Sequence, residues 1–169
     1  FFAVCLFADV SGFSDITDSL MMHGQHGAET LAGLMRAVFD PLFGSVHEYG
    51  GFVATVAGDA FTAVFAEESE TESGRRAAAQ RAMVAARRIQ QQMDSARSQR
   101  TPYGDFRLSV KVGAACGDVK WGIVASEDEG RAAYYFQGPA IDGSAEAEHG
   151  AKAGEIVFTS CGTEANNFA

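Results

Sequence analysis

Short continuous apolar runs alternate along the chain with longer stretches of helical spacing. The run 3–8 has the length of a strand and no polar position, which is typical of a central strand buried on both faces. Two similar runs, 52–57 and 60–65, are separated only by Gly58 and Asp59, the order that a II′ turn requires. The pattern therefore predicts a buried strand, followed later by a tight hairpin.

The rest of the chain predicts interleaved helices and strands. Helical spacing of apolar residues predicts three helices, over 31–46, 75–97 and 141–151, and Pro41 should kink or divide the first of them. Apolar runs predict four more strands, over 106–116, 119–124, 132–137 and 156–159. The first two of these would be joined as a second hairpin at Gly117 and Asp118. Polar stretches predict loops or turns at 67–74, 101–104 and 126–131. Since two connections are hairpins, we expect an α+β sandwich with a mostly antiparallel sheet.

Composition is that of an acidic globular protein. The 169 residues include 13 Lys and Arg against 22 Asp and Glu, with 47% hydrophobic residues, which suits one domain over 1–169. The negative charge disfavours nucleic-acid and anionic-membrane surfaces, which need clustered basic residues. No apolar run reaches the length of about 20 residues that spans a bilayer. Three scattered cysteines, Cys5, Cys116 and Cys161, indicate reduced thiols in a cytoplasmic protein. Since no Met begins the chain, we expect a domain excised from a longer one.

Two acidic residues stand where chemistry is possible. Asp9 follows the first apolar run and Asp59 lies in the hairpin turn, so neighbouring strands would project both carboxylates from one sheet edge. Close carboxylates repel unless a cation lies between them, and oxygen ligands suit Mg²⁺ or Mn²⁺. The turn after Asp9 offers backbone N–H groups for a phosphate at a helix start, through Ser11, Gly12, Phe13 and Ser14. Taken singly, Asp59 is better explained as a turn former and Asp9 as a helix N-cap. Taken jointly with their flanking sequence, the two acids are better explained as a metal-binding pair.

Four regions, in the same order along the chain, resemble motifs of the class III adenylate and guanylate cyclase catalytic domain. The segment 7–14 resembles the first motif, and 49–65 resembles the second, in which two glycines, a strand, Gly-Asp and another strand follow one another. The segment 112–117 resembles the fourth-strand motif, while 138–142 and 153–156 resemble the final helix and strand. The resemblance covers nearly the whole chain and implies a ferredoxin-like α+β sandwich with a mostly antiparallel sheet.

The resemblance also implies a reaction and assigns residues to it. In this family of phosphorus–oxygen lyases, a ribose 3′-hydroxyl attacks the α-phosphorus of a nucleoside triphosphate and pyrophosphate leaves, with two Mg²⁺ or Mn²⁺ ions assisting. The implied metal ligands are the carboxylates of Asp9 and Asp59 and the carbonyl of Val10. The implied phosphate contacts are the segment 11–14 and Lys111, although a strand lysine facing water explains Lys111 equally well.

The other half of the family's site is missing from this sequence. Family sites form between two catalytic halves, and the opposite half supplies an Asn and an Arg where this chain has Asp142 and Glu146. A carboxylate cannot replace that arginine because its charge is reversed. The base-selecting positions are Thr55 and Tyr135, which leaves ATP and GTP both open. This pattern most closely resembles the first catalytic half of bicarbonate-responsive soluble adenylyl cyclases.

Two functions follow from this pattern. We expect the metal-binding half of a nucleotidyl cyclase that works with a second cyclase half, since a homodimer of this chain would lack the arginine at both sites. The alternative is a degenerate cyclase-like domain that binds Mg-nucleotide or an anion and regulates a fused effector. A diguanylate cyclase is disfavoured, because the turn at 57–61 lacks the second acid of that family's motif.

Overall fold

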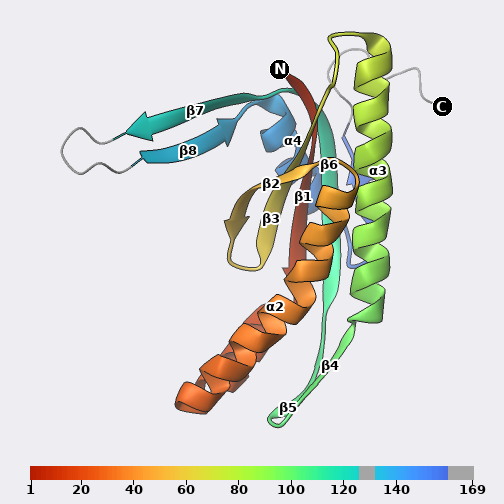
Figure 1. The fold of residues 1–169 in the computed structure, drawn as a ribbon. Helices are drawn as coiled ribbons and strands as arrows, with labels where there is room; N and C mark the ends of the chain where they lie inside the picture. The colour runs from red at the N-terminus through yellow and green to blue at the C-terminus, as the bar shows by residue number, and fades with distance from the viewer. Residues whose placement is uncertain (126–131, 160–169) are drawn as a thin grey trace.

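The fold is built on a central sheet with helices on both of its faces (Figure 1). The computed structural model describes residues 1–125 and 132–159. Its helices are α1 (Phe13–Met21), α2 (Gly24–Glu48), α3 (Glu72–Ser95) and α4 (Pro139–His149). Its strands are β1 (Phe2–Ser11), β2 (Phe52–Ala57), β3 (Ala60–Ala66), β4 (Ser98–Thr101), β5 (Gly104–Arg107), β6 (Ser109–Asp118), β7 (Lys120–Ala125), β8 (Ala132–Gln137) and β9 (Ile156–Phe158).

Strand β1 lies at the centre of the main sheet. Within the described residues this sheet has five strands, in the order β2-β3-β1-β6-β9. The first four pair antiparallel with their neighbours, and β9 runs parallel to β6. The order of β1, β2, β3 and β6, with helices in the two crossovers, is that of a ferredoxin-like sandwich. This arrangement confirms the predicted α+β class with a mostly antiparallel sheet.

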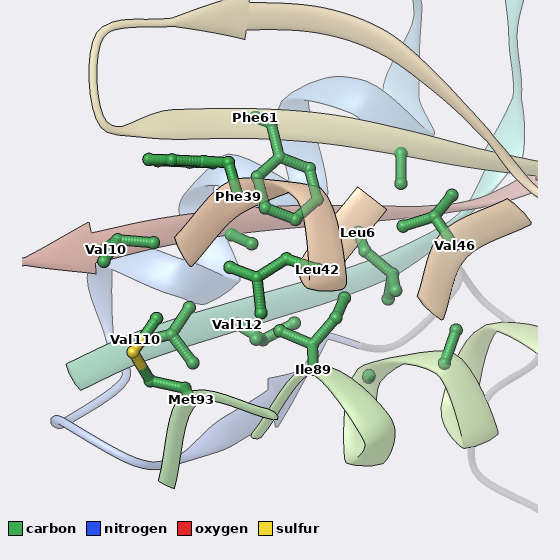
Figure 2. Packing of buried hydrophobic residues seen from close by; sticks show 14 of the residues in the cluster. Leu6, Val10, Phe39, Leu42, Val46, Phe61, Ile89, Met93, Val110 and Val112 are labelled. Atoms are coloured by element: carbon green, nitrogen blue, oxygen red, sulfur yellow. The ribbon is translucent and has the colours of Figure 1, made fainter. Parts of the chain in front are cut away.

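Alternate residues of β1 face the two sides of the sheet. Val4, Leu6, Ala8 and Val10 belong to the larger core, which α1, α2 and α3 cover. Figure 2 shows how side chains of the sheet meet those of α2 and α3 in this core. Ala3 and Cys5 face the smaller cluster, which includes Ala140 of α4. Because both faces are covered, the strand is apolar until Asp9.

Helix α2 is continuous through Pro41, so the chain is not divided into two helices there. A proline inside a helix costs about 3 kcal/mol, since it removes one backbone hydrogen bond and crowds the preceding turn. Val38, Leu42 and Val46 on the same helix are buried, and burying such a side chain stabilises by about 1.5–3 kcal/mol each. Packing of the apolar face therefore outweighs the local penalty.

The predicted second hairpin is wrong. Strand β6 pairs with β1 and β9, whereas β7 pairs with β8 in a separate two-stranded ribbon that projects from the main sheet (Figure 1). The N–H of Val119 donates a hydrogen bond to the carbonyl of Phe1, so the chain continues beyond the end of β1 instead of turning back. The predicted turn at 101–104 is part of a short hairpin of β4 and β5. The predicted loop 126–131 lies outside the described residues.

The expected free thiol is found at one of the cysteines. Cys5 is buried and free, and its burial raises the pKa of the thiol to about 12. Cys116 is disulfide-bonded, so the expectation of a reduced thiol is wrong there; pairing depends on tertiary approach, which spacing in the sequence does not reveal. Cys161 lies outside the described residues. In the described part of the chain, no helix has the length and apolar character needed to cross a membrane.

Candidate active site

Strand β1 carries Asp9 and Val10 into the paired part of the sheet. The turn predicted directly after Asp9 is wrong at Val10 and Ser11, because the strand runs on to Ser11. Asp9 lies opposite Ala60 of β3 on one side and opposite Lys111 of β6 on the other. Pairing with β6 satisfies the backbone of these last residues, which favours strand over turn. Asp9 is therefore held between two strands and is not a helix cap.

The turn between β2 and β3 places Asp59 beside the end of β1. Gly58 has φ +63°, and no other residue type in the described chain has a positive φ, which fits the predicted glycine-first turn. The N–H of Val10 donates a hydrogen bond of 3.0 Å to the carbonyl oxygen of Asp59. The backbones of the two predicted metal ligands, Asp9 and Asp59, are thus brought to the same end of neighbouring strands.

Lys111 lies between Asp9 and a second carboxylate that comes from α4. Its Nζ is 3.4 Å from Oδ2 of Asp9 and 2.5 Å from Oε1 of Glu148. The side chains of Asp9 and Lys111 are 27% and 26% exposed, whereas that of Glu148 is 7% exposed. The neighbouring Glu148 carboxylate raises the pKa of Lys111, so the ammonium is charged at neutral pH.

Close packing of α4 on β6 brings Glu148 to this position. A Cβ at Gly113 would lie 2.0 Å from the carbonyl oxygen of Ser144 and 2.2 Å from the backbone nitrogen of Glu148, so only glycine permits this approach. Sequence reasoning missed Glu148. Helical spacing offered a signal, because Ala140, Ser144 and Glu148 are four residues apart and share the buried face of α4. A charged residue on such a face indicates an ion-pair partner.

The predicted phosphate loop is mainly a helix start. Ser11 ends β1, Gly12 is the N-cap of α1, and the first turn begins with the buried Phe13 followed by Ser14. Gly12 has φ +105°, and a Cβ there would lie 2.5 Å from the carbonyl oxygen of Arg107, so the position requires glycine. Within the described residues no side chain caps the helix, which leaves its first N–H groups for solvent or an anion.

The positions where the chain departs from the cyclase pattern lie on other elements. Asp142 is in the first turn of α4, and Glu146 of the same helix lines a cavity of about 600 Å³ against β6 and β9. Thr55 lies in β2 opposite Thr62. Tyr135 lies in β8 opposite Gly122 of β7. A Cβ added at Gly122 would lie 2.8 Å from the ring of Tyr135. Among the described residues, none of these four side chains is ion-paired with Asp9 or Lys111.

The ribbon of β7 and β8 exposes large apolar side chains. Trp121 of β7 is 59% exposed, so it does not lie in the core. Its neighbours on the ribbon are similarly open, and they include Ile123, Val124, Tyr134 and Tyr135. A ring contact of 5.4 Å between Phe136 and Phe52 connects this ribbon to β2. Because side chains alternate along a strand, Trp121, Ile123 and Tyr134 lie on one face of the ribbon, and Val124 and Tyr135 lie on the other. Exposed apolar side chains gathered on one face are typical of interaction surfaces.

The fold is found in solved nucleotide cyclases. No family model and no curated protein matches the chain. A guanylate cyclase domain of RhGC from Catenaria anguillulae, in complex with GTP, is 16% identical, with 94% of this chain and 78% of that chain covered and a TM-score of 0.72. The guanylyl cyclase Cya2 is 20% identical, with 94% of this chain and 75% of that chain covered and a TM-score of 0.74. The adenylyl cyclase CyaB from P. aeruginosa is also 20% identical, with 94% of this chain and 76% of that chain covered and a TM-score of 0.67. The chain has the fold of the adenylyl and guanylyl cyclase catalytic domains.

Proposed function

We propose that this chain is the metal-binding half of a class III nucleotidyl cyclase, which converts ATP or GTP to a 3′,5′-cyclic nucleotide and pyrophosphate together with a partner half. The hydrogen bond from Val10 to the carbonyl of Asp59 is the observation that carries the proposal. It holds the Asp59 turn against the strand that bears Asp9, as a shared cation site requires. The solved structures with this fold include domains that act on either nucleotide class.

The donor atoms fit a magnesium or manganese site. Asp9 and Asp59 offer carboxylate oxygens and Val10 a carbonyl, which are hard ligands suited to these cations. Among the described residues no cluster of three or more His, Cys, Asp or Glu could hold a metal. Two carboxylates suffice for Mg²⁺, whose remaining ligands are commonly waters and substrate phosphates. Two such ions, when bound, would neutralise the triphosphate and lower the pKa of the attacking ribose hydroxyl.

The start of α1 and Lys111 would bind the phosphates. The N–H groups after Gly12 point out of the N-terminus of a nine-residue helix, where the helix dipole favours an anion. Lys111 stands on the neighbouring strand with a charged ammonium beside Asp9. A phosphate arriving at this edge would meet both donors, so the chain would orient the triphosphate with its own backbone and one lysine.

A partner half would supply what this chain lacks. Asp142 and Glu146 cannot stabilise a transferring phosphate, because both carry negative charge. The exposed apolar ribbon of β7 and β8 gives a surface on which a second half could dock. A pair made of two copies of this chain would have neither the Asn nor the Arg at either site. The active unit we propose is therefore this chain with a different cyclase half.

The isolated chain should show negligible cyclase turnover with Mg²⁺ or Mn²⁺ and either ATP or GTP. Losing an arginine that stabilises phosphoryl transfer removes around 10³–10⁵ in rate. The measurement is cyclic nucleotide formed by the purified chain, compared with the same chain mixed with its native second half. Robust product from the isolated chain would contradict the half-site argument.

Four substitutions in the complete system test the division of roles. Asp9→Asn and Asp59→Asn should each abolish cyclic nucleotide formation by removing a metal ligand. Asp142→Ala and Glu146→Ala should leave the rate nearly unchanged, because they lie in the second, vestigial site. Full activity of the variants at Asp9 and Asp59 would leave the alternative function, a regulatory domain that binds Mg-nucleotide or an anion. The observation that favours this alternative is the presence of Asp142 and Glu146 where a working cyclase half has Asn and Arg. Loss of activity without Glu146 would contradict the vestigial assignment.

A further inference from the structure

One ammonium group is shared between two carboxylates that differ in their surroundings. Nζ of Lys111 is 3.4 Å from Asp9, whose side chain is partly exposed at the candidate metal site. The same atom is 2.5 Å from Glu148, whose side chain is 7% exposed and lies on the buried face of α4. Asp9 can therefore bind a cation from solvent, whereas Glu148 depends on the cation that the protein provides.

An ammonium beside Asp9 opposes divalent-cation binding there. It repels the incoming ion and already partly neutralises the carboxylate that would bind it. Glu148 acts against this effect, because a buried carboxylate is costly unless it is paired, and Lys111 is its ion-pair partner in the described structure. The close approach of α4 at Gly113 fixes the backbone of Glu148 against β6, so the carboxylate holds its end of the pair in place.

We propose that Glu148 is a positioning residue of the metal site, which draws the Lys111 ammonium away from Asp9 and so keeps Asp9 available to a divalent cation. The inference rests on the proposed function, since it takes Asp9 as a metal ligand. Glu148 acts only through Lys111 and touches neither the cation nor the nucleotide. The pair sets the cation affinity of the empty site before any triphosphate arrives.

Mn²⁺ binding to the protein alone tests this role, measured by the electron paramagnetic resonance signal of free Mn²⁺ without nucleotide. Glu148→Gln should weaken binding roughly three- to tenfold, because Lys111 then has Asp9 as its remaining carboxylate partner. Lys111→Met should strengthen binding by a similar factor, since the competing charge is gone. The double variant should bind as Lys111→Met does, because Glu148 has no route to the site without Lys111.

The double variant also separates this role from a plain charge effect. If Glu148→Gln weakens Mn²⁺ binding equally with and without Lys111, Glu148 acts through its own field and the proposal is overturned. An unchanged or tighter affinity in Glu148→Gln overturns it as well. Glu146→Gln is the matched control, since it removes the same charge from the same helix two residues away, on the opposite face. It should leave Mn²⁺ affinity unchanged.

Two further variants keep the tests of site and role apart. Asp9→Asn and Asp59→Asn should each abolish Mn²⁺ binding; if binding survives both, the metal site of the proposed function is wrong. If they abolish binding but Glu148→Gln does not alter it, only the role of Glu148 is wrong. Circular dichroism checks that each variant is folded. Should Glu148→Gln fail to fold, Glu148→Asp replaces it in both backgrounds, because it keeps the charge but shortens the reach to Lys111, and it should weaken binding in the same direction.

Discussion

Lys111 connects the sheet to α4 through an ion pair. The residue stands on β6 beside Asp9, and its ammonium pairs with the buried Glu148 of the helix. The sequence allowed two interpretations of Lys111, a phosphate contact and a strand lysine facing water. The structure gives it two carboxylate partners, so a third role in stability accompanies any role toward a phosphate.

Removing this ammonium should destabilise the fold. We expect Lys111→Met to lower the free energy of unfolding by about 2 kcal/mol, because Glu148 would stay buried without its cation. The raised pKa of Lys111 means that its contribution is complete at neutral pH and is lost as the pH rises through that raised pKa. Denaturant unfolding should therefore show that Lys111→Met has a lower free energy of unfolding than the wild type at neutral pH, and that this difference becomes smaller above about pH 10.

The control for that experiment replaces both partners. In Lys111→Met/Glu148→Leu no charge is left to desolvate, so most of the lost stability should return. If the double variant is as unstable as the sum of the single ones, the two residues do not stabilise the fold as a pair.

At the scale of elements, the contact between α4 and β6 depends on one residue without a side chain. Gly113 faces α4, and a Cβ there would meet the helix backbone at Ser144 and at Glu148. Backbone atoms cannot rotate away as a side-chain tip can, so α4 would have to move. Movement of α4 would carry Glu148 away from Lys111.

Two glycine substitutions should therefore have opposite effects. Gly113→Ala should destabilise by about 1–3 kcal/mol, the usual cost of overpacking, and should also disturb the Lys111 ion pair. Gly33→Ala, on the exposed face of α2 with nothing within 4 Å, should stabilise by up to about 1 kcal/mol. Thermal unfolding of the two variants beside the wild type measures both; a neutral Gly113→Ala would mean that α4 adapts without cost.

Local signals predicted the elements and non-local contacts decided the pairing. The strand 52–57 and its glycine-first turn agree with the structure, because a tight hairpin is specified by adjacent residues. The β6–β7 pairing was wrong, because β6 finds its partner β1 about a hundred residues earlier in the sequence. The sequence predicted that Asp9 and Asp59 lie at one sheet edge, because they belong to neighbouring strands. The position of Glu148 could not be predicted in this way, because it depends on how α4 packs against β6.

At the scale of the whole molecule, the β7–β8 ribbon extends away from the sheet and bears an apolar surface on a chain of net charge −9. Exposed aromatic side chains contribute strongly to association because they bury a large area at small entropic cost. Under the proposed function, the second half would dock on the ribbon and cover Trp121 and Ile123.

Polar substitution on the ribbon should weaken assembly without harming the fold. Trp121→Ser and Ile123→Ser should each lower the affinity for the second half by roughly tenfold or more, the effect of removing a central apolar contact. Isothermal titration measures the affinity, and thermal unfolding of the unmixed chain should be unchanged. Met83→Ser, at an exposed apolar position of α3, is the control and should leave the affinity unaltered. Equal weakening by all three would point to a surface other than the ribbon.

The central place of β1 has a consequence for how the protein is made. A ribosome synthesises this strand before its partners, yet Ala8 pairs with Phe61 and Val10 pairs with Val110. The nascent chain thus carries an apolar strand whose second edge stays open until β6 has emerged. Pairing over such distances is slow, and an open apolar edge invites intermolecular pairing. Fragments that stop before β6 should therefore aggregate, and the yield of soluble protein should depend on chaperones that shield β1 during synthesis.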